Sequence, residues 1–221
     1  SIMLDYFFIL KWYFFGRFKI GRRARKKAAF EKFNEVLSSL EEGCTVIDAG
    51  ANVGELTKIF LDKGLTVHAF EPDPIAIVEL KSRCQSEDNL ILFQTAVGLK
   101  NETKKLYRYR KFDEANPYST QGSSLLEYRS GKNKPFVEIT VINLIEYIKK
   151  IPNDLSLLKM DIEGSEVEIL NEIINEGLHR KIGNIFVETH ERFSHSLGLE
   201  TAKLKLKIKN LNINNINLDW V

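Results

Sequence analysis

Two segments of the chain combine acidic side chains with groups that can take up a proton. In Lys-Met-Asp-Ile-Glu-Gly at 159–164, Asp161 and Glu163 lie two residues apart at the end of an apolar run. Side chains two apart point to the same side of an extended strand, so the two carboxylates would act together if the strand persists. Such a pair could bind an ammonium group, accept a proton or hold a divalent cation. Alternatively, acids at a helix N-terminus only stabilise the helix.

The second segment is Glu-Thr-His at 188–190, which follows the next apolar run. A lone histidine is usually structural, but His190 would lie beside the carboxylate segment at the same edge of a sheet. We therefore take Asp161, Glu163 and His190 as candidates for the base or for metal ligands. Lys159 is a further candidate catalytic residue that could orient an acceptor, although a solvated lysine at a strand end is an equal interpretation.

A glycine-containing turn, Asp-Ala-Gly-Ala-Asn-Val-Gly at 48–54, connects a predicted strand to a predicted helix. Gly50 allows a tight turn and close approach of a ligand to the backbone, and Gly54 allows the following helix to pack closely. We expect Asp48 and Asn52 to face the ligand. The turn lacks the G-x-G-x-x-G spacing that brings backbone amides to a pyrophosphate. It therefore favours a cofactor that carries an ammonium group and no phosphate.

Glu71 closes the next apolar run, 21 residues after Gly50. An acid at this distance accepts hydrogen bonds from ribose hydroxyls in nucleoside-binding folds. On its own, Glu71 could equally be a surface acid before the turn at Pro72. Together with the glycine turn, it predicts a nucleoside site.

The elements that must position these residues alternate along the chain. We expect strands at 44–50, 66–72, 89–97, 156–164, 184–190 and 216–221, and helices at 24–40, 54–63, 74–84, 165–177 and 200–210. This alternation predicts an α/β fold with a mostly parallel sheet and helices on both faces. Ligands of such folds bind at the carboxyl ends of the strands, where the motifs above lie.

These motifs, in this order and spacing, resemble the FkbM family of methyltransferases over about residues 44–192. The resemblance rests on V-I-D-A-G-A-N-V-G, F-E-P, L-K-M-D-I-E-G-S-E and V-E-T-H, and Gly-Ser-Ser-Leu at 122–125 is similar to the family's mid-chain loop. It implies a Rossmann-like class I methyltransferase fold with seven strands and S-adenosylmethionine as methyl donor. It also implies O-methylation of a hydroxyl on a sugar, glycan or natural product.

For that cofactor, we expect contacts from the glycine turn, from Glu71 and Pro72, from Asp161, and from the end of the third strand, where adenine would lie. The set is Asp48, Gly50, Ala51, Asn52, Gly54, Glu71, Pro72, Thr95, Ala96 and Asp161. A divalent cation is a possible second cofactor, with Asp161, Glu163 and His190 as its ligands. Two other functions stay open: an NAD(P)-dependent oxidoreductase on a similar fold, and a non-catalytic nucleoside-binding module. Nucleic acid is an unexpected partner, because no D/N-P-P-Y/F motif follows the fourth strand.

The chain is expected to divide into an N-terminal helical, aromatic and basic appendage at 1–43 and a methyltransferase domain at 44–221. Residues 103–142 would form an inserted hairpin or lid within that domain. Residues 6–15 are aromatic and apolar, and seven cations follow between Arg17 and Lys27. Residues 1–27 could make a peripheral membrane contact or a homo-oligomer contact. The run is shorter than the roughly 20 residues that span a bilayer, and two cysteines form no disulfide framework. We therefore expect a cytoplasmic protein, which is peripheral to a membrane if residues 1–27 make the membrane contact.

Overall fold

The computed structural model describes residues 2–85, 88–109, 111–125 and 135–220. The helices are α1 (Ile2–Arg17), α2 (Arg22–Ser39), α3 (Glu55–Asp62), α4 (Pro74–Arg83), α5 (Leu144–Lys150), α6 (Glu166–Asn175) and α7 (His195–Asn210), with short 3-10 helices η1 (Pro117–Thr120) and η3 (Leu178–Lys181). The strands are β1 (Thr45–Ala49), β2 (Thr66–Phe70), β3 (Leu90–Phe93), β4 (Ala96–Gly98), β5 (Glu102–Tyr107), β6 (Phe136–Asn143), β7 (Leu155–Met160), β8 (Ile182–Val187) and β9 (Ile216–Asn217).

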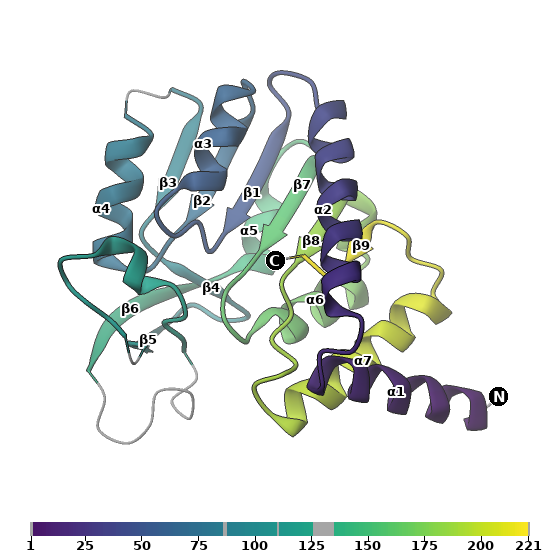
Figure 1. Ribbon diagram of the computed structural model, residues 1–221. Coiled ribbons are helices and arrows are strands. Elements are labelled where there is room, and N and C mark those ends of the chain that lie inside the picture. The colour runs from purple at the N-terminus through teal and green to yellow at the C-terminus, as the bar shows by residue number, and fades with distance from the viewer. Residues whose placement is uncertain (1, 86–87, 110, 126–134, 221) are drawn as a thin grey trace.

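The main sheet has the order β3-β2-β1-β7-β8-β9, and each of its pairings is parallel (Figure 1). The chain runs outward from β1 to β2 and β3, and then returns to β7 on the other side of β1. The strand order therefore reverses between β1 and β7, which is where such sheets bind ligands. This topology confirms the predicted Rossmann-like α/β fold.

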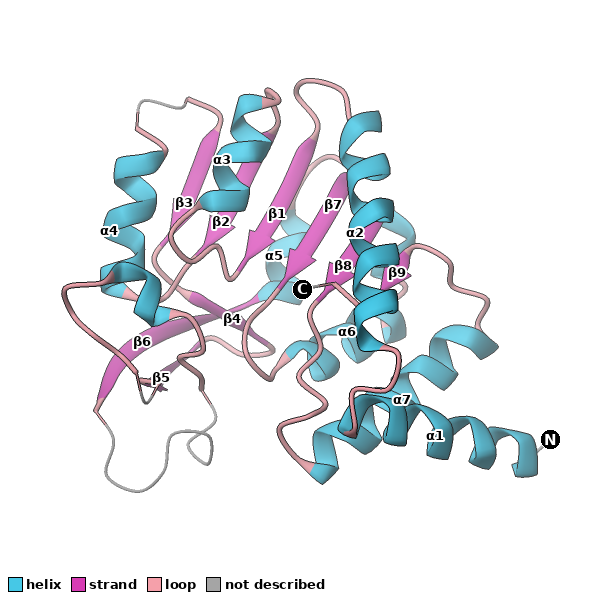
Figure 2. Ribbon diagram, viewed as in Figure 1, coloured by secondary structure: helices cyan, strands magenta, loops and turns pink. Residues whose placement is uncertain are grey.

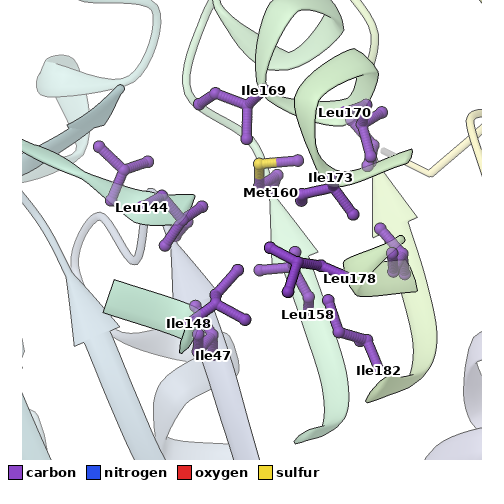
Figure 3. Packing of buried hydrophobic residues seen from close by; sticks show 14 of the residues in the cluster. Ile47, Leu144, Ile148, Leu158, Met160, Ile169, Leu170, Ile173, Leu178 and Ile182 are labelled. Atoms are coloured by element: carbon purple, nitrogen blue, oxygen red, sulfur yellow. The ribbon is translucent and has the colours of Figure 1, made fainter. Parts of the chain in front are cut away.

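Helices cover both faces of this sheet, as expected (Figure 2). Neighbouring residues of β1 point to opposite faces, and each belongs to a different hydrophobic cluster: Ile47 packs with α5, α6 and α7, while Val46 packs with α2, α3 and α4. An apolar stripe of α6 is buried in the first cluster, where Leu170 and Ile173 contact the sheet (Figure 3). Both faces of the strands are thus buried, which explains their continuous apolar runs.

A second, smaller sheet of order β4-β6-β5 lies beside the carboxyl ends of the first (Figure 1). Within the predicted insertion 103–142, β5 pairs antiparallel with β6, while residues 110 and 126–134 lie outside the described residues. The single strand predicted at 89–97 is wrong, because the chain turns after Phe93 and β4 joins the second sheet. Helix α5 was not predicted.

The resemblance implied seven strands, but the described residues form six in the main sheet, and the last of these has only two residues. The chain leaves the sheet after β9 because Asp219 makes an isolated antiparallel bridge with Glu188, and Trp220 then packs in the core. The strand predicted at 216–221 is therefore shorter than expected.

The two N-terminal helices pack differently. Helix α2 contributes Phe33 and Val36 to the cluster that covers β1, whereas α1 rests on α7 and projects sideways from the sheet (Figure 1). The predicted division at residue 43 stays a prediction, although α2 shares the core of the following residues. Among the helices that the structure describes, none is long and apolar enough to cross a membrane.

Candidate active site

A cavity of about 670 Å³ lies at the carboxyl ends of β1, β2 and β7, at the reversal of strand order. Its volume is within the range of small-molecule and cofactor sites. The turn after β1 forms its floor, and Glu71, Asp161 and Glu163 lie in its wall.

The floor requires glycine at two positions. Gly50 has φ +78, and a Cβ built on it would lie 1.8 Å from the carbonyl oxygen of Asp161. Gly54 has φ +80, and its Cβ would lie 2.8 Å from Leu80 on α4. The first glycine thus lets the turn after β1 touch the end of β7, and the second lets α3 begin against α4.

A buried ion pair supports the floor from behind. Lys159 Nζ lies 3.1 Å from Asp48 Oδ1 and donates a hydrogen bond of 2.7 Å to the carbonyl oxygen of Gly50. Thr57 Oγ1 donates to the other carboxylate oxygen of Asp48 at 2.7 Å. Burial lowers the pKa of Lys159, but Asp48 and Asp161 outweigh it and raise that pKa overall. Lys159 therefore stays cationic and holds the turn in place.

The carboxylate of Glu71 is fixed by backbone amides on both sides. Asn52 N donates to Oε2 at 2.7 Å, and Asp73 N donates to Oε1 at 2.8 Å. The side chain is only 5% exposed. Burial raises the pKa of Glu71 to about 8, although the Asn52 amide and Lys159 oppose this shift. The second lone pair of each oxygen stays available to a ligand in the cavity.

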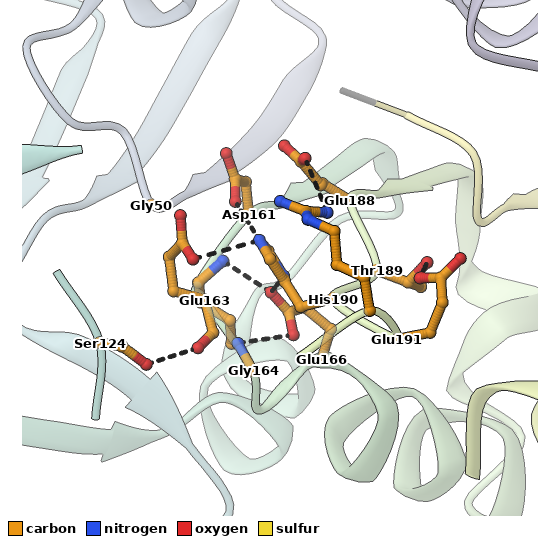
Figure 4. Close-up of polar contacts among 12 residues, drawn as sticks. Gly50, Ser124, Asp161, Glu163, Gly164, Glu166, Glu188, Thr189, His190 and Glu191 are labelled. Atoms are coloured by element: carbon orange, nitrogen blue, oxygen red, sulfur yellow. Dashed lines mark hydrogen bonds and ion pairs between the residues drawn. The ribbon is translucent and has the colours of Figure 1, made fainter. Parts of the chain in front are cut away.

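A cluster of carboxylates surrounds His190 at the end of β7 and β8 (Figure 4). His190 Nδ1 lies 2.9 Å from Glu166 Oε1, and Nε2 lies 3.3 Å from Glu163 Oε2 and 3.8 Å from Asp161 Oδ1. A carboxylate can only accept, so Nδ1 carries a proton and Nε2 faces the two acids. Burial opposes protonation of His190, but the hydrogen bond to Glu166 and the nearby acids outweigh it and raise the pKa.

Glu166 organises the turn that carries these acids. Its Oε1 accepts from the amide of Ile162 at 3.0 Å and its Oε2 from the amide of Gly164 at 2.9 Å. The strand was predicted to continue to residue 164, but it ends at Met160, and Glu163 has φ +62. The turn nevertheless brings Asp161 and Glu163 to the same imidazole nitrogen, and a left-handed non-glycine residue often marks a functional site.

The loop around η1 closes the cavity from the side of the second sheet. Ser124 Oγ donates to the carbonyl oxygen of Glu163 at 2.7 Å, and Asn52 Nδ2 donates to Thr120 Oγ1 at 3.2 Å. Arg108 at the end of β5 forms a buried ion pair with Asp73, next to Glu71. The small sheet is thus tied to both the predicted nucleoside end and the carboxylate cluster.

Comparison with known proteins decides the family. Residues 48–204 of the 221 match the model of the methyltransferase FkbM domain. The chain belongs to the FkbM family of methyltransferases. It is thus an S-adenosylmethionine-dependent methyltransferase, and this replaces the NAD(P)-dependent oxidoreductase and the non-catalytic module as interpretations.

No curated relative matches this FkbM methyltransferase. Among solved structures, it is similar to a TehB-like SAM-dependent methyltransferase from Corynebacterium glutamicum, with 12% identity over 83% of each chain and a TM-score of 0.34. At that TM-score the likeness supports no conclusion about the site.

The cavity of this FkbM methyltransferase fits S-adenosylmethionine. Glu71 offers two fixed carboxylate oxygens to a ribose, and Gly50 lets the turn that lines the cavity lie directly against the end of β7. Asp161 Oδ1 accepts no hydrogen bond from the described part of the chain, which suits an ammonium group as its partner. Desolvation raises the pKa of Asp161, Lys159 opposes the shift, and Glu188 and Glu163 add to it.

The predicted metal ligands meet only in part. Asp161, Glu166 and His190 each offer a ligand atom within 4.8 Å of the others. Glu166 already accepts two backbone amides and His190 Nδ1, so its oxygens are poor ligands. Of the predicted ligands, Asp161 and His190 belong to this group and Glu163 does not.

Most of the residues predicted from sequence line the cavity of this enzyme. They are Gly50, Ala51, Asn52, Glu71, Pro72, Ala96, Lys159, Asp161 and Glu163. The other predicted residues lie behind this wall. Asp48 is fully buried and does not face the ligand as expected, because Lys159 and Thr57 hold its carboxylate beneath the turn. Gly54 is the N-cap of α3, Thr95 lies in the turn before β4, and His190 lies behind Glu163.

Several residues of the wall were not predicted. Helix α2 contributes Phe30, Phe33, Asn34 and Leu37, and Glu188, Leu56, Ile59 and Trp220 complete that side. Glu188 belongs to the quoted V-E-T-H motif and lies 3.7 Å from Arg22. A helix was predicted at 24–40, but no local signal shows that its buried face, with Phe33 and Val36, meets the cavity.

Proposed function

We propose that this methyltransferase methylates a hydroxyl oxygen, and that the acceptor is a sugar, a glycan or a natural product. The observation that carries the proposal is the cluster of Glu163, His190 and Glu166 beside the cofactor turn. An alcohol is a weak nucleophile near neutral pH, so its methylation is helped by a group that takes up the hydroxyl proton. Glu163 lies in the cavity wall, and the imidazole of His190 lies behind it. Glu166 fixes the tautomer of that imidazole.

S-adenosylmethionine, when bound, supplies an electrophilic methyl group. Glu71 and Asn52 hold the nucleoside, and the Gly50 turn and Asp161 hold the amino-acid end. Glu163 accepts the proton of the acceptor hydroxyl, and His190 Nε2, 3.3 Å away, stores it. Glu166 stabilises the imidazolium that forms, in the way that the acid of a catalytic triad does. Held in this way, the acceptor oxygen reaches the distance and alignment that displacement at carbon requires.

The acceptor side of the cavity supports a ring-bearing molecule. Phe30 and Trp220 stack with ring centroids 6.3 Å apart, and both line the cavity. An aromatic surface can pack against the apolar face of a sugar ring, while carboxylates accept its hydroxyl protons.

Labelled methyl transfer to a panel of hydroxylated acceptors tests this proposal. An ether product that survives mild base supports it, whereas a base-labile ester or an N-methyl product contradicts it. Glu163→Gln should lower kcat strongly, while Glu168→Gln, an exposed acid on α6, should leave it unchanged. Assays with a chelator and with added Mg²⁺ test whether a cation takes part. If Mg²⁺ stimulates the activity and Asp161→Asn removes this stimulation, the cluster binds a metal.

A further inference from the structure

Helix α1 has one face that the protein does not cover. Met3, Phe7 and Phe14, with Phe18 just beyond the helix, recur at a spacing that places them on one side, and they are 67%, 60%, 48% and 68% exposed. We call these four residues the outer face of α1. A row of large apolar side chains in water is uncommon on a monomer and marks an interaction site.

The opposite side of the helix is firmly attached, so the outer face has a fixed position. Gly16 is buried against Glu191, the Tyr13 hydroxyl contacts His195, and Arg17 donates to the carbonyl oxygen of Arg192. These contacts join α1 to α7 and to the segment before it.

Cations lie within the outer face, beyond its C-terminal end and on one flank. Lys11 lies within the row at an exposed position, and Lys19 and Arg23 follow it, both exposed. On the flank, Lys209 of α7 stands over the ring of Phe8, 4.7 Å from its centroid. Helix α1 also carries one acid, Asp5, which is half-buried. Its single negative charge is outnumbered by these cations. In contrast, Arg22 and Arg25 of the basic run pair with Glu188 and Asp219 within the protein.

This charge pattern separates the two partners that an apolar helix face could have. A two-fold contact between copies of the chain places the same patch on both sides, so the cations of one patch would face a partner patch that is also cationic. An anionic bilayer instead complements the cations, and aromatic side chains are favoured at the level of the headgroups. We propose that the outer face of α1 binds the surface of an anionic lipid bilayer, with the helix lying in the interface and not crossing it.

The proposal also bears on the active site. Helix α2 begins at Arg22, and Phe30 of the cavity wall lies eight residues later, about 12 Å along the helix. Docking through α1 therefore anchors the chain next to the helix that carries part of that wall.

Flotation of the full chain with phosphatidylcholine vesicles, with and without phosphatidylglycerol, tests the proposal. The protein should float only with the anionic vesicles, and less so at high salt, because salt screens the cations. Phe7→Ser with Phe14→Ser should abolish flotation. Lys11→Glu with Lys19→Glu should weaken partitioning by about tenfold or more.

Matched controls change residues of similar exposure elsewhere. Val78→Ser on α4, and Lys100→Glu with Lys150→Glu, should float like the parent protein. Each variant should bind S-adenosylhomocysteine with unchanged affinity, which shows that the cavity is intact. Equal flotation of the α1 variants, or none of the parent with anionic vesicles, overturns the proposal. So does a dimer in the absence of lipid that the Phe7 and Phe14 substitutions dissociate.

Discussion

The affinity for S-adenosylhomocysteine should depend on pH through the carboxyl group of Glu71. Burial raises its pKa to about 8 in the ligand-free cavity, so the group is mostly protonated at neutral pH. Ribose hydroxyls donate hydrogen bonds, and they bind a carboxylate more strongly than a neutral acid. Binding therefore favours the ionised form, and it should release a proton at any pH below 8.

The magnitude follows from the fraction of ionised Glu71. With a pKa of about 8, that fraction is about 1% at pH 6 and about half at pH 8. If only the ionised form binds, the apparent affinity rises by the same ratio, about 50-fold, which corresponds to about 2 kcal/mol.

Isothermal titration calorimetry measures both consequences. The dissociation constant should fall between pH 6 and 8, and the heat at pH 7 should change between buffers of different ionisation enthalpy. In Glu71→Gln the affinity should be lower at pH 8, by about 1–3 kcal/mol, and the pH dependence due to this carboxyl group should vanish. Glu55→Gln, a more exposed acid that also lines the cavity, is the matched control and should follow the parent.

Titration of the ligand's own amino group is common to all three proteins, so the difference between them isolates Glu71. A parent affinity that does not change with pH, or a Glu71→Gln profile parallel to that of the parent, would refute the reasoning. The first result would mean that the carboxyl group is already ionised without ligand.

Three further predictions concern the supports of the site. Because His190 must be neutral to accept a proton and its pKa is raised, the rate should fall as the pH drops through that raised pKa. Glu166→Gln should move this acidic limb of the pH–rate profile to lower pH and should change kcat more than KM. An acidic limb that does not move excludes Glu166 as a positioning residue. Gly50→Ala should destabilise the protein by far more than the roughly 1–2 kcal/mol expected for Gly43→Ala, since both have positive φ but only Gly50 has a close neighbour; equal losses in urea denaturation would contradict this. Lys159→Met should cost about 3–5 kcal/mol by leaving Asp48 buried without its cation, and adding Asp48→Asn should restore part of that loss; a double variant no more stable than Lys159→Met would show that the pair is not coupled.

Local sequence was sufficient for the framework of the fold. Continuous β-branched and apolar runs predict buried parallel strands, and the glycine turn after β1 predicts a tight approach, because these signals come from residues adjacent in the chain. For the same reason, Gly50, Asn52, Glu71 and Asp161 could be assigned to one edge of the sheet before their distances were known.

What the tertiary structure decided depends on contacts between distant segments. Glu166 lies in the first turn of α6, where its sequence position suggests only an acid that stabilises the helix, yet it fixes the tautomer of His190, 24 residues away. Asp48 was expected to face the ligand, yet Lys159 from the neighbouring strand draws it beneath the turn. Helix α2 became part of the cavity wall because Phe33 packs against β8 and Trp220, which lie far along the chain. A sequence pattern shows which side of an element is apolar or charged, but only the packing of the whole chain determines what that side meets.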